Sequence, residues 1–139
     1  MRRTILTVGL SAALALGACG DSDGSDPAGP VPIERPNSTA ELEILEPAAA
    51  SVVEGSTVRL RIRLEGARIV PETTTDVVPD EGHLHVMLDE ELISMTEGLD
   101  QSIPDVAPGP HRITVEFVAS DHAPFDPRVV AITTFEVAP

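Results

Sequence analysis

The chain has 139 residues, of which 9 are basic and 23 are acidic, so its formal net charge is -14. This length fits one ordinary domain, and the acidic balance excludes nucleic acid as a partner because phosphate binding needs a basic face. Every basic residue is arginine, which excludes Schiff-base chemistry and a phosphate-loop lysine on this chain.

The N-terminal segment, residues 1–18, has the three zones of an export signal. Arg2 and Arg3 give a positive start, and an apolar stretch from Ile5 to Leu16 follows before small residues. That stretch is shorter than the roughly 20 residues that a membrane-spanning helix needs. We therefore expect residues 1–18 to be a signal peptide that is removed on export.

The signal ends in Leu16-Gly17-Ala18-Cys19, which resembles the bacterial lipobox. The resemblance implies cleavage before Cys19, lipidation of its thiol and acylation of the new amine with palmitate-type chains. Cys19 is the one cysteine of the chain, and a lone cysteine in an exported protein needs such an explanation. Because two or three acyl chains anchor a protein stably, we expect attachment to the extracytoplasmic side of the cell membrane or the outer membrane. The alternative is an ordinary signal peptide with an incidental cysteine.

Residues 19–40 have the composition of a flexible tether, rich in Gly, Asp, Ser and Pro and without apolar periodicity. Asp21, Asp23 and Asp26 suggest a calcium loop, but the distal Glu of a hand-type loop is missing. We expect a solvated spacer that holds a single domain, residues 41–139, clear of the bilayer.

In that domain apolar residues alternate with polar ones, the period-two pattern of half-buried antiparallel strands. The pattern is clearest where Val58, Leu60 and Ile62 alternate with arginines. The arginine stripe suggests either an anion site or, as we expect, pairing with acids on neighbouring strands. The expected strands lie around Leu42 and Ile44 and at Ser56–Glu65, His83–Leu88, Leu99–Val106, His111–Val118 and Val129–Val137.

Prolines interrupt this pattern twice. Ala107–Pro110 is a predicted turn, and Asp121–Pro127 is a predicted loop because it contains two prolines. Ile132 has the opposite parity to the inward residues of the last strand, which favours a β-bulge there. About six or seven short strands without a helical period predict an all-β fold, an immunoglobulin-like antiparallel β-sandwich.

Four histidines form the chemical constellation of the sequence: His83, His85, His111 and His122. His83 and His85 are two apart on a predicted strand, so both rings project from one face. That separation suits two ligands of one zinc or copper ion, with His111 or His122 completing the site. The alternative is that the pair faces solvent or hydrogen-bonds loops while His111 orders its turn, with no cofactor.

The same residues carry a resemblance. Gly82–Leu92 and Ile103–Val137 resemble a bacterial domain family of exported proteins with the pattern GHxH, then PGxH, then DHxP. The resemblance implies an immunoglobulin-like fold and an uncharacterised function, and it brings no mechanism. Leu84 stands where some relatives carry a further histidine, so this chain has one potential metal ligand fewer. The motif positions on this chain are Gly82, His83, His85, Asp89, Gly109, His111, Asp121, His122 and Pro124.

No catalytic residues are expected. Ser120-Asp121-His122 are adjacent and so cannot form a nucleophile-base relay, and the chain contains neither GxSxG nor HExxH. The acids at 89–91 are expected to be a solvated face rather than a glycosidase pair. The sequence thus predicts a non-enzymatic binding or structural module of the cell envelope that meets an unknown envelope protein or ligand. A histidine-based copper or zinc lipoprotein is the alternative, and an enzyme with an unrecognised site is the third.

Overall fold

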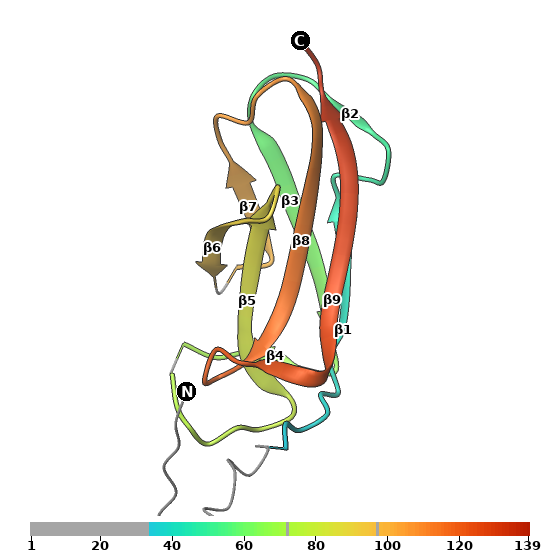
Figure 1. Cartoon of the computed structure of the whole chain (residues 1–139). Coiled ribbons are helices and arrows are strands. Elements are labelled where there is room, and N and C mark those ends of the chain that lie inside the picture. Colours follow the sequence, from blue (N-terminus) through green and yellow to red (C-terminus); the bar gives the residue numbers. More distant parts are fainter. Residues whose placement is uncertain (1–33, 72, 97) are drawn as a thin grey trace, which may run out of the picture. The chain divides into compact units, whose positions relative to one another are not determined.

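The computed structural model describes residues 34–71, 73–96 and 98–139, and these form β-strands without a helix (Figure 1). None of the described residues belongs to a helix that is long and apolar enough to cross a membrane. The predictions for the signal peptide, Cys19 and most of the tether fall on residues 1–33, outside the described residues. The strands are β1 (Glu41–Glu46), β2 (Val52–Val53), β3 (Val58–Glu65), β4 (Arg68–Ile69), β5 (Glu81–Leu88), β6 (Glu91–Thr96), β7 (Asp100–Ile103), β8 (Gly109–Ala119) and β9 (Pro124–Val137).

Two sheets share these strands. One is 3-stranded with the order β1-β3-β7, and the other is 6-stranded with the order β2-β9-β8-β5-β4, where β6 also pairs with β5. The pairings are antiparallel except for two short parallel ones, β2 with β9 and β4 with β5. Figure 1 shows β5, β8 and β9 as the long neighbouring ribbons of the larger sheet. The predicted β-sandwich is confirmed.

The alternation in β3 explains the smaller sheet. Val58 and Leu60 are fully buried, whereas the arginines beside them point away from the core. Arg59 and Arg61 lie 3.3 and 3.2 Å from the Asp100 carboxylate on β7. The arginine stripe therefore pairs with acids on a neighbouring strand, as expected, and such exposed pairs contribute little stability.

The larger sheet supplies most of the core. Leu84 and Val86 of β5 and Phe117 of β8 have no exposed surface, and the ring of Phe117 stacks on that of Phe125 with 5.7 Å between centroids. Because side chains alternate along a strand, burying Leu84 and Val86 turns their neighbours His83 and His85 onto the outer face of this sheet. The hydrophobic pattern thus places the histidine pair.

The segment between β8 and β9 differs from its prediction. We predict a loop over Asp121–Pro127, but β9 begins at Pro124, and Phe125 is 1% exposed within the core. The register of the ladder shifts between Phe117 and Val118, so the extra residues of β9 are accommodated there. The prolines are tolerated because β2 pairs with β9 only near its other end, which leaves this stretch paired on one side.

The predicted bulge at Ile132 is wrong. The β8–β9 ladder runs without a shift from Val129 to Val137, and Ile132 pairs with Thr114. Every second residue of this stretch faces the core, so Ile132 points outward and is 52% exposed. The prediction assumed that an apolar residue in this strand faces the core, whereas Ile132 lies on the outer face.

A hairpin between β5 and β6 is a structural finding without a sequence prediction. Its turn is Asp89-Glu90, with φ of 49 and 75 degrees, and Leu88 pairs with Glu91. Two successive left-handed residues are typical of a type I′ turn, which usually carries Asn-Gly or Asp-Gly. The acids predicted to form a solvated face are exposed, but they build this turn and the start of β6.

Candidate functional site

Three of the four histidines meet at one end of the larger sheet. His83 and His85 come from the outer face of β5, and His122 comes from the connection between β8 and β9. The ring of His122 stacks on that of His83, with 4.3 Å between centroids, and lies 5.5 Å from that of His85. We call His83, His85 and His122 the histidine cluster. The structure thus brings His122 to the predicted pair.

A tight turn after β8 delivers His122. Its N–H donates to the Ala119 carbonyl at 2.8 Å, and its φ is 62 degrees, a left-handed conformation that is uncommon for residues with a side chain and that gathers at functional sites. Asp121 braces the turn, because its carboxylate accepts from the Ala123 N–H at 3.0 Å and from Arg35 at 2.6 and 2.9 Å. The hydrogen bonds from Arg35 hold the pKa of Asp121 below its usual value.

Hydrogen bonds fix the ring orientations in the cluster. His83 Nε2 lies 3.4 Å from the Ser120 carbonyl oxygen, which only accepts, so this nitrogen carries a proton. His85 Nε2 lies 3.2 Å from His122 Nδ1, and His122 Nε2 lies 3.1 Å from the Thr73 hydroxyl. Two nitrogens of different rings therefore face each other directly.

The cluster is partly shielded from water, because His83 is buried whereas His85 and His122 are half-buried. His83 is 6% exposed, and the β4–β5 connection folds beside it, with the Thr74 N–H donating to the Ser120 carbonyl at 3.1 Å. Burial and then repulsion from His122 lower the pKa of His85. His85 is therefore neutral at pH 7, which is the state in which imidazole serves as a metal ligand.

His111 lies elsewhere, at the beginning of β8, whereas His122 follows the end of the same strand. Its Nδ1 donates to Asp89 Oδ2 at 2.6 Å and its Nε2 donates to the Ala107 carbonyl at 2.7 Å. Neither acceptor can donate to the ring, so both nitrogens carry protons, and the hydrogen bond to Asp89 raises the pKa of His111. His111 orders the start of β8 by clamping it to the β5–β6 turn.

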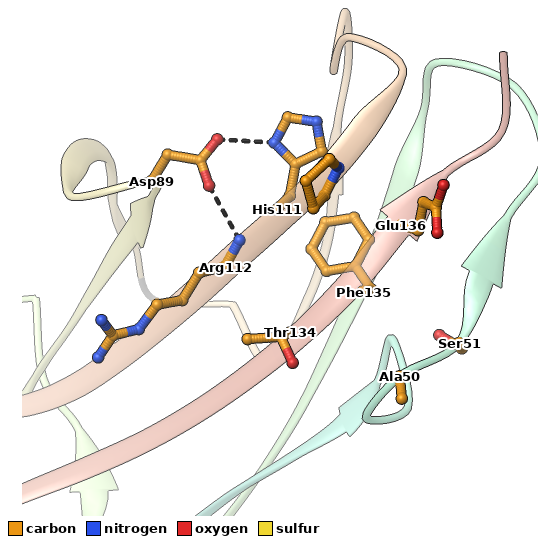
Figure 2. A pocket seen from close by; sticks show the side chains of 9 residues that line it. Ala50, Ser51, Asp89, His111, Arg112, Thr134, Phe135 and Glu136 are labelled. Carbon is orange, nitrogen blue, oxygen red and sulfur yellow. Dashed lines mark hydrogen bonds and ion pairs between the residues drawn. The ribbon is translucent and has the colours of Figure 1, made fainter.

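A surface hollow of about 490 Å³ adjoins this ion pair. Figure 2 shows Asp89 between the His111 ring and the Arg112 N–H, which donates to Asp89 Oδ1 at 2.9 Å. Ser51 also lines the hollow, so a serine, a histidine and an aspartate share it. A ring that donates from both nitrogens cannot accept a hydroxyl proton, and these three residues therefore do not act as a catalytic triad.

The His111–Asp89 pair predicts a pH dependence of stability. Removal of the Asp89 carboxylate from water opposes ionisation, but hydrogen bonds from Arg112 and His111 outweigh it and lower the pKa of Asp89. The raised pKa of His111 gives stability that is present below its unfolded value of 6.5 and is lost as the pH rises through the folded value. The lowered pKa of Asp89 gives stability that is present above 3.8 and is lost in stronger acid.

We therefore expect the substitution His111→Gln to reduce the free energy of unfolding more at pH 5.5 than at pH 8.5. Urea denaturation of the native chain and of His111→Gln at both pH values measures this difference. Subtracting the variant's free energy of unfolding from that of the native chain cancels the contribution of the other histidines. An equal loss of stability at both pH values would contradict the ion pair.

Metal-binding geometry is incomplete if only histidines and acids are considered. In the described part of the chain, no group of three or more His, Cys, Asp or Glu side chains is arranged to hold a metal ion. Stacking keeps the ring of His83 within 10 degrees of parallel to that of His122, and its Nε2 points to Ser120. The cluster offers two facing nitrogens, from His85 and His122, rather than three.

Sequence reasoning missed the residues that support the cluster. Arg35 and Ser38 lie in the predicted tether, yet Arg35 binds Asp121 and the Ser38 hydroxyl donates to the Pro79 carbonyl at 2.7 Å. The sequence signal for Arg35 is weak, a single cation in an acidic segment. Thr73 shows no signal, because only the fold brings it to His122.

The chain is similar to solved structures of other proteins. The chain is similar to the fibronectin(III)-like modules of Clostridium thermocellum CbhA, at 17% identity and a TM-score of 0.50, over 70% of this chain and 94% of that one. It also matches the PKD domain of human KIAA0319, at 12% identity and a TM-score of 0.44, over 88% of this chain and 93% of that one. The first of these likenesses supports the sandwich fold and nothing further.

At the level of sequence, no curated protein matches the chain. A family model described as a family of unknown function, DUF6130, matches residues 3–138. This agrees with the expected resemblance to an uncharacterised family with an immunoglobulin-like fold. Because the match covers nearly the whole sequence, the chain belongs to the DUF6130 family.

Proposed function

We propose that this DUF6130 chain is a lipid-anchored, non-enzymatic binding module on the extracytoplasmic side of the cell membrane or outer membrane. Leu16-Gly17-Ala18-Cys19 supports the anchor, and the fibronectin-like sandwich supports a module rather than an enzyme. The doubly protonated His111 supports the same conclusion, because it removes the one Ser-His-Asp grouping around the hollow.

The observation that carries the proposal is the sequence Leu16-Gly17-Ala18-Cys19, which resembles a lipobox and ends in the one cysteine of the chain. A thiol at this position is the acceptor that lipidation needs, and two or three acyl chains anchor a protein stably.

The anchor is tested by mass and by partitioning. We expect intact mass spectrometry of the protein from membranes to give residues 19–139 plus acyl groups, and we expect the protein to enter the detergent phase. Cys19→Ser removes the acceptor thiol and should leave an unacylated protein in the aqueous phase, whereas Ser25→Ala should behave like the native chain. An unmodified, freely secreted native protein would overturn the anchor.

A second candidate function, a histidine-based metal lipoprotein, is favoured by one distance. His85 Nε2 and His122 Nδ1 are 3.2 Å apart, and two nitrogens bound to one tetrahedral ion at 2.0–2.1 Å lie about 3.3 Å apart. The Thr73 hydroxyl at His122 Nε2 can accept the remaining proton of that ring. Metal-bound histidines commonly have such a partner for the second nitrogen.

Metal binding predicts a gain in stability. With the ion at a hundredfold excess over its dissociation constant, the free energy of unfolding should rise by about 2.7 kcal/mol. Zn2+, Cu2+ and Cu+ are added separately to the full chain, and unfolding is followed by circular dichroism. The gain should vanish in His85→Gln and persist in His111→Gln, whose ring lies outside the cluster. No gain with any ion, or an equal gain in His85→Gln, would exclude this candidate.

A further inference from the structure

A thioether lies beside the two facing nitrogens. Across the β5–β6 ladder His85 pairs with Met95, and directly paired residues on one face of a sheet have Cβ atoms about 4.5–5.5 Å apart. Met95 is 62% exposed, and a methionine side chain with three rotatable bonds adapts easily to a neighbour. A sulfur ligand is therefore within reach of His85.

The nearest carboxylates are already engaged. Glu116 pairs with His85 on the other side of β5, but its two oxygens accept from Arg128 at 2.7 and 2.5 Å. Asp121, adjacent to His122, has both oxygens bound by Arg35. The oxygen ligands that hard divalent cations prefer are thus occupied by arginines.

The remaining ligands are soft and uncharged. Two imidazole nitrogens and one thioether sulfur suit monovalent copper, since thioether ligands select Cu+ among the biological metals. Zn2+ favours four ligands and usually takes thiolate, imidazole or carboxylate, and the described residues offer no such third group here.

We propose that His85 Nε2, His122 Nδ1 and Met95 Sδ form a binding site for Cu+. The inference rests on the metal-binding candidate above and specifies its ion and its third ligand. The site is partly preorganised, because stacking on His83 and the Thr73 hydroxyl hold the His122 ring in place before an ion arrives. Met95, on the exposed strand β6, closes the site from the solvent side.

The test uses the full chain carrying Cys19→Ser, which removes the one thiol of the sequence, so that any sulfur bound to copper comes from methionine. Anaerobic competition with a colorimetric Cu+ chelator measures stoichiometry and affinity, and copper-edge X-ray absorption identifies the bound atoms. We expect one Cu+ per chain with nitrogen and sulfur neighbours. Met95→Leu should remove the sulfur and weaken Cu+ binding at least tenfold.

Met87→Leu is the matched control, because Met87 lies on the same strand and face as His85 but pairs with Leu92. It should bind Cu+ like the parent chain. Unchanged affinity or a persistent sulfur signal in Met95→Leu overturns the proposed site. Binding of Zn2+ or Cu2+ that requires His85, without Cu+ binding, overturns the soft site but keeps the metal-binding candidate. Absence of all binding overturns both, and equal melting temperatures of the methionine variants exclude misfolding as the cause.

Discussion

Replacing Gly82 by Ala should destabilise the sandwich by about 3 kcal/mol, at the upper end of the usual cost of overpacking. A Cβ atom at this position would lie 2.0 Å from the Val118 carbonyl oxygen and 2.9 Å from the Phe117 ring. The first contact is with backbone of the paired strand, so no side-chain rotation relieves it. Urea denaturation of the native and variant chains measures the loss.

Gly55 provides the comparison. Its φ of 78 degrees is left-handed, and a Cβ atom added there would have nothing within 4 Å, so Gly55→Ala carries only the conformational cost of about 1–2 kcal/mol. Gly82 has no such φ, so its cost is purely steric. A smaller loss for Gly82→Ala than for Gly55→Ala would show that β5 and β8 can separate at this point.

The lack of space for a side chain at Gly82 also matters for the histidine cluster. The glycine lets β8 approach β5 closely, with Gly82 paired to Ala119 and His83 to Val118. That approach sets the start of the β8–β9 turn against β5, and the turn carries His122. We expect Gly82→Ala to disturb the histidine cluster as well as the core.

The sequence predicts the fold well where burial alone decides. The alternation of Val58, Leu60 and Ile62 with arginines defines β3 without ambiguity, and the alternation around Leu84 places His83 and His85 on one face. Each of these predictions needed only the alternation of apolar and polar side chains within one strand. The position of His83 and His85 on one face of a strand was therefore predictable, whereas the approach of His122 to them was not.

The third member of the cluster depends on a long-range arrangement. His122 joins it through a left-handed turn that Asp121 stabilises with an arginine 86 residues away in the sequence. His111 has the same chemistry but is captured by Asp89, at the tip of a hairpin whose Asp-Glu turn gives no familiar sequence signal. The local sequence around each histidine therefore does not show whether His111 or His122 joins His83 and His85.

Seven of the nine motif positions named from the sequence divide into two physical groups. Gly82, His83, His85 and His122 build one end of the larger sheet, where steric fit and ring stacking dominate. The second group lies at the other ends of the same strands. It contains Asp89 and His111, which form the ion pair, and Gly109, whose φ of 127 degrees suits glycine. The motif therefore describes one candidate binding site and one structural clamp.

Replacing Arg128 by Met should destabilise the chain by about 2 kcal/mol, because it leaves the carboxylate of Glu116 without its partner. The Glu116 side chain is 6% exposed and accepts two hydrogen bonds from the guanidinium. Removing one member of a buried pair costs about 3–5 kcal/mol, and we discount this because the Arg128 side chain is 64% exposed and water can approach. Urea denaturation at pH 7 measures the loss.

The double variant separates the charge from the packing. Glu116→Gln alone should cost little, since an exposed arginine regains its water, and adding Arg128→Met to Glu116→Gln should cost much less than Arg128→Met in the native chain. Equal costs in the two backgrounds would show that Arg128 stabilises the chain through its alkyl stem alone. Arg128→Met also frees the carboxylate that is paired across the sheet from His85. Because methionine would itself add a thioether, the metal test uses Arg128→Leu, which frees the same carboxylate: this variant should bind Zn2+ more tightly relative to Cu+ than the native chain does.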